Sequence, residues 1–253
     1  MTVKFLGTGT SQGVPVIACD CPVCTSSDKK DKRLRSSVLV EIGDRHIVID
    51  TGPDFRYQML REQVTQLDAV LFTHSHKDHI AGLDDVRAFN RQQGAIAVYG
   101  TAEVHHALKR EFYYAFTLKK YPGVPQLKLF EISTLPFDLF GVKVVPIEVM
   151  HYMMPVLGFR IGGFTYITDA KTVTDAEIRK IKGTKVLIVN ALQRDPHISH
   201  FTLDEAVAFA QRVGAEQTYF THISHKLGLH KEVQKELPAG ISLAYDGLVL
   251  NRF

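Results

Sequence analysis

Residues 74–79 read His-Ser-His-Lys-Asp-His, so three imidazoles and one carboxylate fall within one short run. The run follows the apolar segment 68–73, Asp-Ala-Val-Leu-Phe-Thr, which has the length and composition of a buried strand. A strand fixes the base of the loop that follows it and leaves the tip open, so such loops often carry active sites. Imidazole nitrogen together with carboxylate oxygen suits Zn²⁺, Fe or Mn²⁺. We interpret the run as a metal site that needs further ligands from elsewhere in the fold.

The composition is ordinary for a globular chain. Its 253 residues fit one large domain over 1–253, with 45% hydrophobic and 23% charged residues. The net charge of +3 is too small to favour nucleic acid as a partner. No apolar run approaches the roughly 18 residues that a membrane span needs. Residues 1–6 enter a strand-like pattern with no signal-peptide features, so we expect a cytoplasmic protein with no membrane partner.

Strand-like and helix-like segments alternate along the chain. Strands are predicted where short β-branched or apolar runs lie between turn formers, and helices where apolar residues recur at helical spacing. We expect strands at 3–6, 37–42, 46–50, 96–99, 143–149, 158–168, 186–189 and 217–221, and helices at 54–66, 80–92, 102–112, 174–182 and 203–213. Residues 113–136 show no clean period and are predicted to be an irregular insertion. Strands followed by helices in both halves predict an α/β fold with two packed sheets and helices outside.

Three further candidate ligands each end a predicted strand. They are His151, Asp169 and His222, and each follows an apolar run of strand length. Taken singly these signals are weak, because a strand-end aspartate is often a turn former and a lone histidine is often structural. Together with the loop at 74–79 they supply five histidines and two aspartates, enough for two metal ions and one bridging carboxylate.

The histidine loop matches a known signature. Residues 73–79 resemble the T-H-x-H-x-D-H motif of the metallo-β-lactamase superfamily, and the three later ligands follow in its order. Residues 48–52, Val-Ile-Asp-Thr-Gly, resemble the strand of that superfamily that ends in an Asp-x-Gly turn. The resemblance extends from about residue 3 to residue 247. It implies an αββα four-layer metallo-β-lactamase-like sandwich with the metals at one edge.

The resemblance also implies a role for each ligand. One metal would be held by His74, His76 and His151, and the other by Asp78, His79 and His222. Asp169 would bridge the two ions, and Asp50 would hydrogen-bond a ligating histidine. Asp78 is expected to belong to the catalytic centre as well. Two ions about 3.5–4 Å apart share a water and lower its pKa toward 7, which favours hydrolysis of an anionic ester such as a phosphodiester.

The cysteines form a separate cluster. Cys19, Cys21 and Cys24 make a Cys-x-Cys-x-x-Cys run, a loop over 19–24 in which three thiolates can converge on one ion. A tetrahedral structural zinc needs a fourth ligand, and His225 is our candidate because it lies just past a predicted strand end. Unliganded reduced thiols are the alternative. A redox-active pair is disfavoured because no Cys-x-x-Cys opens a helix.

Three segments narrow the resemblance. Residues 7–15, the cysteine run and residues 221–225 resemble the PhnP-type phosphodiesterases, which are similar to tRNase Z but lack its long tRNA-binding arm. That family implies a dinuclear site (commonly manganese), a separate structural zinc held by a Cys₃His set, and small cyclic phosphodiesters of ribose as substrates. A homodimer is the partner that the resemblance suggests.

We therefore expect a dinuclear metal-dependent phosphodiesterase that hydrolyses small cyclic ribose or nucleoside phosphodiesters. Its cofactors would be two divalent ions, Mn or Zn or Fe, and one structural Zn. Two alternatives keep the metals and change the substrate: a tRNase Z-like endoribonuclease, or a hydrolase of lactones or thioesters. A metal-stabilised binding module is a poor interpretation, because an open site costs more stability than a closed structural site needs.

A leaving alkoxide needs a proton, and His200 is the predicted acid. It precedes a predicted helix capped by Thr202 with Glu205 three residues on, a capping-box pattern. In PhnP-type and tRNase Z-like families a histidine at this point contacts phosphate or protonates the leaving group. His197 remains the alternative for this role.

Several other features are expected to be structural. Gly7-x-Gly9-x-x-x-Gly13 departs from the dinucleotide-binding spacing and precedes no helix, so a Rossmann fold is rejected. These glycines either let the backbone approach the metal edge or only form a turn. Residues 29–33, Lys-Lys-Asp-Lys-Arg, are predicted to form a solvated loop. Asp246 is expected to be structural. The remaining histidines singled out as surface or packing residues are His46, His105, His106 and His230.

Overall fold

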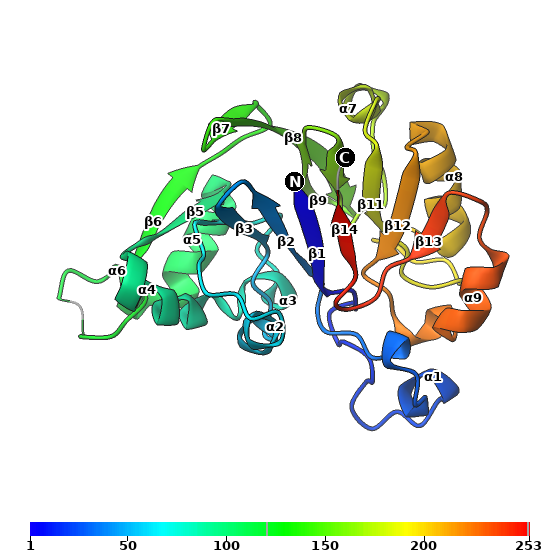
Figure 1. Ribbon diagram of the computed structural model, residues 1–253, viewed down its shortest axis with the longest axis horizontal. Helices are drawn as coiled ribbons and strands as arrows, with labels where there is room; N and C mark the ends of the chain where they lie inside the picture. The colour runs from blue at the N-terminus through cyan, green and yellow to red at the C-terminus, as the bar shows by residue number, and fades with distance from the viewer. Residues whose placement is uncertain (120, 252) are drawn as a thin grey trace.

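A computed structural model describes residues 1–119, 121–251 and 253. Within these residues two seven-stranded sheets face each other, in the orders β14-β1-β2-β3-β4-β5-β6 and β13-β12-β11-β10-β9-β8-β7 (Figure 1). The first sheet consists of β1 (Thr2–Gly7), β2 (Ser37–Ile42), β3 (Arg45–Ile49), β4 (Ala69–Leu71), β5 (Ile96–Gly100), β6 (Leu127–Glu131) and β14 (Val249–Asn251). The second consists of β7 (Phe137–Leu139), β8 (Val142–His151), β9 (Met154–Ile161), β10 (Phe164–Tyr166), β11 (Val186–Asn190), β12 (Gln217–Thr221) and β13 (Ile241–Leu243).

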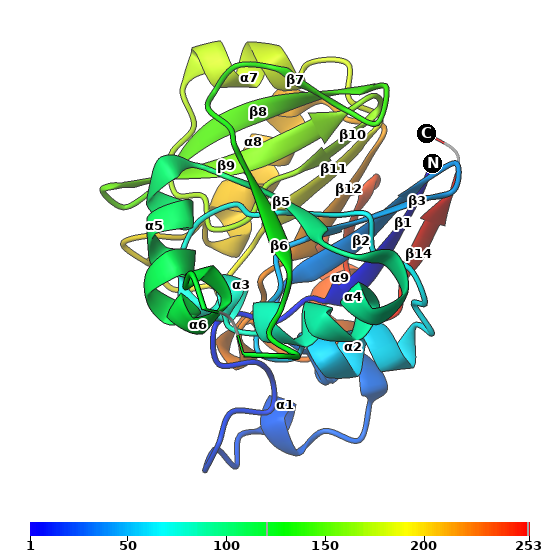
Figure 2. The ribbon, with the colours of Figure 1, turned by 90° about the vertical axis from the view of Figure 1, so that its left-hand side faces the viewer.

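Helices cover the outer face of each sheet (Figure 2). The first sheet is covered by α2 (Phe55–Arg61), α3 (Lys77–Ile80), η2 (Leu83–Val86), α4 (Arg87–Gln93), α5 (Ala102–Glu111) and α6 (Tyr113–Phe116). The second is covered by α7 (Asp175–Ile181), α8 (Leu203–Val213) and α9 (His230–Glu236). The chain also contains the short elements α1 (Pro22–Thr25), η1 (Lys29–Asp31) and η3 (His225–Leu227), and α1 lies at the bottom of Figure 1. This arrangement confirms the predicted αββα sandwich.

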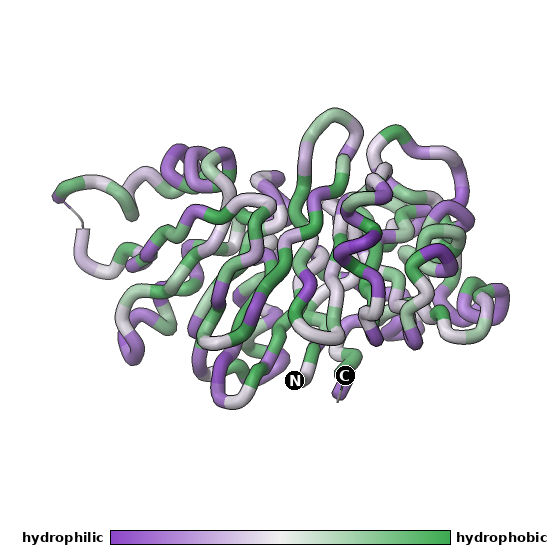
Figure 3. The backbone as a smooth tube through the Cα atoms, turned by 90° about the horizontal axis from the view of Figure 1, so that it is seen from above, coloured by the Kyte–Doolittle hydropathy of each residue, from purple (hydrophilic) through white to green (hydrophobic). Residues whose placement is uncertain are grey.

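The two faces of the strands explain the layering. In β4, Ala69 and Leu71 belong to the core between the sheets, whereas Val70 packs toward the helices. Successive side chains of a strand point to opposite faces, so a strand buried on both faces is apolar throughout. Figure 3 shows hydrophobic and hydrophilic stretches alternating along the backbone. The strands of this sheet therefore lie between two cores, one shared with the other sheet and one shared with the helices.

One predicted region is wrong. Residues 113–136 contain α6 and the strand β6, which pairs in parallel with β5, and are not an irregular insertion. β6 is the edge of its sheet, and its alternate side chains are only half-buried. An edge strand of this kind carries a weak apolar pattern, which is why the sequence did not reveal it.

Other boundaries differ in smaller ways. The predicted strand 158–168 is two strands, β9 and β10, joined by a turn in which Gly162 has φ +57°. The helix expected over 54–66 ends at Arg61, and the one over 80–92 is divided among the end of α3, η2 and α4. No strand was predicted for β7, β13 or β14, each three residues long. Short elements give too few residues for a period to be recognised.

The basic segment at 29–33 is not uniformly solvated, which corrects that prediction. Arg33 is 4% exposed and donates to Thr8 Oγ1 at 2.8 Å and to the Ala244 carbonyl at 2.7 Å. Asp31 is also buried and accepts from the backbone N–H of His230 at 2.7 Å. These long-range bonds attach the N-terminal loop to the C-terminal half. Within the residues described, the longest and most apolar helices still fall short of what crossing a membrane requires.

Candidate active site

The predicted metal ligands gather where strands from both sheets end. His74, His76, Asp78 and His79 follow β4, His151 ends β8, and Asp169 and His222 follow β10 and β12. Their ligand atoms form three overlapping groups, each with all atoms within 4.8 Å: Asp78, His79, Asp169 and His222; His74, His76 and Asp169; His151, Asp169 and His200. Asp169 belongs to all three groups. The structure therefore brings together the full set of residues selected from sequence.

Asp169 stands between the two sides of this cluster. Its Oδ2 lies 3.5 Å from His74 Nε2 and 3.5 Å from His79 Nε2. Its Oδ1 lies 3.1 Å from His222 Nδ1 and accepts a hydrogen bond from Thr168 Oγ1 at 2.6 Å. One carboxylate thus faces imidazoles that arrive from opposite sides.

The distances between the ligand atoms suit binding to a shared divalent ion better than hydrogen bonding among the ligands. His74 Nε2 and His79 Nε2 are buried and make no hydrogen bond, although Asp78 Oδ2 lies 3.1 Å from His79 Nε2. Ligands bound to one ion at about 2.1 Å are separated by about 3.0–3.4 Å, which is close to these spacings. Buried polar atoms without partners are costly, and a shared cation would satisfy them. The residues present therefore fit the bound metals expected of this site.

Asp50 and Thr73 orient two of the histidines. Asp50 Oδ2 lies 2.8 Å from His79 Nδ1, and the same carboxylate accepts from the N–H of Thr73 at 2.9 Å and from its hydroxyl at 2.8 Å. Thr73 Oγ1 in turn lies 2.9 Å from His74 Nδ1. Such contacts fix the ring orientation and leave each Nε2 facing inward.

Gly52 lets the turn after β3 approach the histidine loop. A Cβ added at Gly52 would lie 2.2 Å from the Asp78 carbonyl oxygen, which no side chain can accommodate. The N–H of Thr51 donates to the His79 carbonyl at 2.7 Å. The Asp-x-Gly turn therefore needs glycine at its third position so that Asp50 can reach His79.

Three site residues adopt left-handed backbone conformations. Asp50, Asp169 and His222 have φ values of +64°, +55° and +55°, and each directly follows a strand or its short extension. Non-glycine residues rarely occupy this region, and the strain is of order 1–3 kcal/mol each. Backbone strain at three convergent strand ends is typical of a functional site.

Other contacts position the remaining histidines. His151 Nδ1 lies 2.9 Å from the Ser199 carbonyl, which leaves Nε2 free to face the cluster. His222 Nδ1 lies 3.2 Å from Ser36 Oγ, and its Nε2 lies 3.2 Å from Thr10 Oγ1. Sequence reasoning missed Ser36 and Ser199 because no motif links them to the histidines, and it used Thr10 only as part of the segment 7–15. Thr73 was quoted within the signature, so it could have been selected.

Burial and neighbouring charges shift the pKa values of several groups in the cluster. Burial opposes charge on His79, but Asp78, Asp169 and Asp50 together raise the pKa of this imidazole well above its usual range. Burial would raise the pKa of Asp169, yet His222 and His79 hold the pKa of this carboxyl well below its usual range. Burial lowers the pKa of His74 well below the usual range, so this imidazole stays neutral and able to ligate. The carboxylates around His79 thus favour a positive charge beside them, which a bound cation would supply.

His200, the predicted general acid, lies next to the cluster. It is 7% exposed, and its ring centre lies 4.5 Å from that of His151 and 4.9 Å from that of His222. Its Nδ1 is buried without a hydrogen bond. Burial, and then the neighbouring His222, lower the pKa of His200 to about 3. The alternative, His197, is half-buried with its ring centre 5.0 Å from that of His200, and its Nδ1 accepts from the N–H of Ser199 at 3.3 Å.

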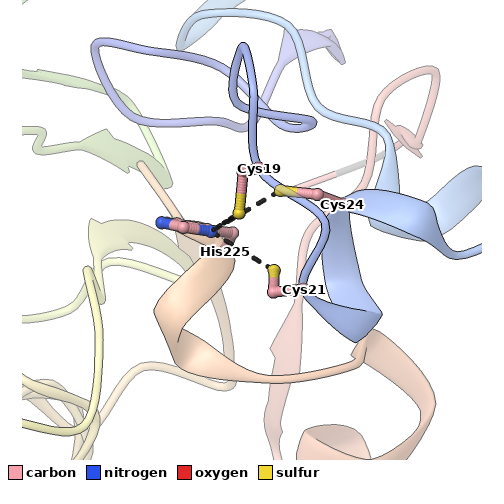
Figure 4. A group of neighbouring side chains, drawn as sticks. All are labelled: Cys19, Cys21, Cys24 and His225. Atoms are coloured by element: carbon pink, nitrogen blue, oxygen red, sulfur yellow. Dashed lines mark hydrogen bonds between the residues drawn. The ribbon is translucent and has the colours of Figure 1, made fainter.

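The cysteine run converges on His225 (Figure 4). The sulfur atoms of Cys19, Cys21 and Cys24 lie 3.3, 3.4 and 3.5 Å from His225 Nδ1. Tetrahedral zinc with Zn–N and Zn–S bonds of about 2.0 and 2.3 Å places such ligands about 3.5 Å apart. A hydrogen bond from the backbone of Cys24 and the contact with His225 outweigh burial and lower the pKa of Cys21 to about 6. The four predicted residues therefore fit a closed zinc site.

Comparisons with known proteins agree with the fold and the site. Residues 45–223 match the Beta-lactamase superfamily domain, and the chain belongs to this superfamily of metal-dependent hydrolases. A crystal structure described as a new diphosphatase from the PhnP family matches with a TM-score of 0.94 and 42% identity, over 100% of this chain and 98% of that one. Within the superfamily the chain is therefore a member of the PhnP family. The family requires divalent metals, and the histidine and aspartate cluster is the candidate site for them.

Two other relatives are informative in a limited way. An octanoyltransferase from Porphyromonas gingivalis is 41% identical over 98% of this chain, but the chain spans only 51% of that protein. The chain thus covers about half of this relative, and the name does not say which half carries the activity. The short form of human tRNase Z matches with a TM-score of 0.72 at 20% identity over 99% of both chains, which shows the fold alone.

Proposed function

We propose that this chain is a dinuclear metal-dependent phosphodiesterase that hydrolyses small cyclic ribose or nucleoside phosphodiesters. The observation that carries the proposal is the position of Asp169 Oδ2, 3.5 Å from the Nε2 atoms of both His74 and His79. One carboxylate oxygen shared by imidazoles from two groups suits a pair of ions and not a single one. Under this proposal one ion is held by His74, His76 and His151, the other by Asp78, His79 and His222, and both by Asp169.

The protein groups around the ions would orient the ligands and balance their charge. Two bound divalent ions supply an activated water and positive charge for the non-bridging oxygens of a phosphodiester. Asp50 and Thr73 keep the rings of His79 and His74 aimed inward. Asp78, at the edge of the cluster, contributes negative charge that balances the cations. A neutral ester such as a lactone gains less from this charged site than a phosphodiester does.

His200 is proposed to protonate the leaving oxygen. Its pKa of about 3 keeps the imidazole neutral in the free protein, and the charge of a bound phosphate ester would raise that pKa. The variant His200→Ala should retain turnover of activated aryl phosphodiesters, whose leaving groups need no proton. It should lose most turnover of ribose phosphodiesters, roughly 10²–10⁴-fold. Equal losses on both substrates would show that His200 positions the ester instead.

A diphosphate is the second candidate substrate, because the PhnP-family structure with 42% identity is described as a diphosphatase. In a diphosphate that carries a substituent at each end, every phosphorus atom has two oxygen-linked substituents, as the phosphorus of a phosphodiester does. The endoribonuclease alternative has weaker support, since the likeness to human tRNase Z is 20% identity and shows the fold alone. The octanoyltransferase name likewise supports no acyl-transfer activity here, because half of that protein lies outside the match.

A substrate panel tests the proposal. Purified holoprotein is assayed with 2′,3′-cyclic nucleotides, a dinucleoside diphosphate, pre-tRNA, a lactone and a thioester, with Asp169→Ala as the site-specific control. We expect turnover of the cyclic phosphodiesters that is lost in the variant. Turnover confined to pre-tRNA, or to the lactone or thioester, would reject the proposal. Turnover confined to the diphosphate would select the second candidate.

Elemental analysis of the same preparation tests the metals. We propose two ions of Mn, Zn or Fe at the histidine and aspartate cluster, and one zinc held by Cys19, Cys21, Cys24 and His225. Asp169→Ala should retain the zinc and lose at least one of the two catalytic ions. If the variant keeps both catalytic ions, Asp169 does not bridge them. A cytoplasmic location and a homodimer remain proposals that fractionation and sedimentation would test.

A further inference from the structure

A cavity of about 590 Å³ opens beside two of the candidate metal ligands, His76 and His151. Its other walls come from the turn between β8 and β9 and from the loop that precedes His200. The remaining lining residues are Tyr152, Met153, Met154, Pro155, Ile198 and Ser199. An ester bound at the metal ligands would therefore place one of its substituents in this cavity.

Three large apolar side chains of this cavity face solvent. The exposed fractions of Tyr152, Met153 and Ile198 are 57%, 76% and 65%. Among the residues that the structure describes, no Asp, Glu, Lys or Arg lines the cavity. We call these three residues the apolar wall. Exposed apolar side chains gathered at the rim of a polar site mark a surface that binds an apolar group.

The backbone at Tyr152 is strained. Tyr152 and Met153 form the two-residue turn between β8 and β9, which reaches outward at the left of Figure 2, and Tyr152 has φ +57°. The first central position of such a turn favours glycine, asparagine or aspartate when φ is positive. Tyrosine is a poor choice for the turn alone, as is Phe140 in the turn between β7 and β8, so it is the position of the Tyr152 ring beside the metal ligands that distinguishes it.

The side of the cluster next to His200 has different chemistry. A smaller cavity of about 210 Å³ lies beside His200 and is lined by His197, Lys226, Ser11 and Ser224, among others. That side suits the charged or hydroxyl-bearing part of a substrate. The apolar wall then receives the part that is planar and uncharged.

We propose that the apolar wall binds the nucleobase of the substrate, with the Tyr152 ring stacked on the base. The inference rests on the proposed function and selects nucleoside phosphodiesters over base-free ribose phosphodiesters. A base has a flat π-face for the tyrosine ring, and the methionine thioethers next to it make favourable contacts with aromatic rings. Tyr152 is thus a specificity-determining residue, and it takes no part in bond cleavage.

The test compares two substrates that differ only in the base. The measured quantity is kcat/KM for adenosine 2′,3′-cyclic phosphate divided by kcat/KM for 1-O-methylribose 2,3-cyclic phosphate. Tyr152→Gly, which suits the turn and removes the ring, should lower this ratio about tenfold, mainly through KM of the adenosine substrate. Tyr152→Phe keeps the ring and should keep the ratio within about twofold of the wild-type value.

The chain offers a matched control at the other end of β8. Phe140 has φ +56°, is 42% exposed and lies in the two-residue turn between β7 and β8. Phe140→Gly removes an aromatic ring from the same kind of turn, far along the strand from His151. It should leave the ratio at the wild-type value. An equal ratio in Tyr152→Gly and wild type overturns the proposal. So does a changed sedimentation coefficient of Tyr152→Gly without a change in ratio, since the wall would then be a protein contact.

A binding measurement separates this proposal from the proposed function. Calorimetry on the holoprotein compares adenosine 5′-monophosphate with ribose 5-phosphate, and neither needs to be hydrolysed. We expect tighter binding of the adenosine ligand, with the preference lost in Tyr152→Gly and kept in Tyr152→Phe. If neither cyclic ester turns over but this preference holds, the proposed function fails and the base site stands. If the esters turn over and no preference exists, only the base site fails.

Discussion

At the scale of single residues, the candidate site depends on groups that hold the ligands as well as on the ligands. Asp50 is fully buried and connects Thr73 to His79, and Thr73 connects in turn to His74. The ligands themselves could be selected from a local motif and from strand ends. The contact between Asp50 and His79 spans 29 residues, and the one between Ser36 and His222 spans 186. Local patterns contain no signal for the second of these.

Asp50→Asn should weaken metal binding. The amide keeps the size of the side chain but removes the negative charge that raises the basicity of His79. We expect apparent affinity for Mn²⁺ or Zn²⁺ to fall by about 10–100-fold, measured by calorimetric titration of metal-free protein. Asp68→Asn is the control, because Asp68 accepts from the N–H of His46 at 2.8 Å and has no contact with the cluster. Equal affinities for the two variants would contradict the assignment.

At the scale of elements, strand ends place the chemistry and short loops complete it. β4, β8, β10 and β12 all deliver ligands at one edge, as expected for strands whose ends meet there. Apolar runs of four to eight residues, the usual signal of a strand, predicted these strands, although β10 was not separated from β9. β6 was not, because an exposed edge needs less apolar surface. The cysteine loop was found from its spacing, and its partner His225, the first residue of η3, was selected because it lies just past a predicted strand end.

Cys24→Ser should destabilise the protein more than any surface change in the same loop. Cys24 is buried, and its sulfur lies 3.5 Å from His225 Nδ1, so its loss opens the proposed zinc site. We expect the free energy of unfolding in urea to fall by several kcal/mol, with zinc reduced by one per chain. Thr25→Ala, which removes an exposed hydroxyl bonded to the Cys21 carbonyl, should change it by less than about 0.5 kcal/mol. Unchanged stability and full zinc content in Cys24→Ser would exclude the site.

The cap of α8 links stability to catalysis. Thr202 Oγ1 accepts from the N–H of Glu205 at 3.3 Å, and Glu205 Oε2 accepts from the N–H of Thr202 at 2.8 Å. Thr202→Ala should lower the free energy of unfolding by about 1 kcal/mol. It should also lower kcat on ribose phosphodiesters, because His200 lies just before the cap.

Thr174→Ala is the matched control for the cap. Thr174 caps α7 through Glu177, with the same donor distance of 3.3 Å, but lies on a helix that carries no candidate site residue. It should have a similar effect on stability and none on kcat. Equal kcat losses in both variants would show that general destabilisation explains the effect.

At the scale of the whole molecule, buried polar contacts attach the N-terminal loop to the C-terminal half. Arg33 contacts Thr8, the Ala244 carbonyl and His230, whose Nδ1 lies 3.1 Å from an Arg33 nitrogen. Asp246 accepts from Thr8 at 2.7 Å and from the N–H of Leu34 at 2.8 Å, in agreement with the structural role expected for it. The prediction for residues 29–33 was wrong because a basic run looks solvated unless its buried partners are known.

These contacts predict a stability that depends on pH. Burial, and then Arg33, lower the pKa of His230 to about 4. The unfolded chain has a value near 6.5, so it binds more protons than the folded chain between these values. Stability from this group is complete above about pH 6.5 and is lost as the pH falls toward 4. His230→Gln removes the titration and should reduce the loss between pH 7 and pH 4.5 by roughly 2 kcal/mol. Urea unfolding at both pH values measures it, and parallel losses in variant and wild type would contradict the prediction.

The amino-acid sequence by itself determined the kinds of groups available and the order in which they occur. The histidine loop, the three strand-end ligands and the cysteine run each carry their signal within a few residues, and apolar periodicity predicted the paired sheets. Only the tertiary structure decided how these parts meet: Asp50 against His79, Ser36 against His222, Arg33 against His230, and the apolar wall beside His151. The physical reason is the distance along the chain over which each kind of signal acts. Periodicity and motifs report on neighbours along the chain, whereas orientation and burial depend on groups that packing brings together from distant positions.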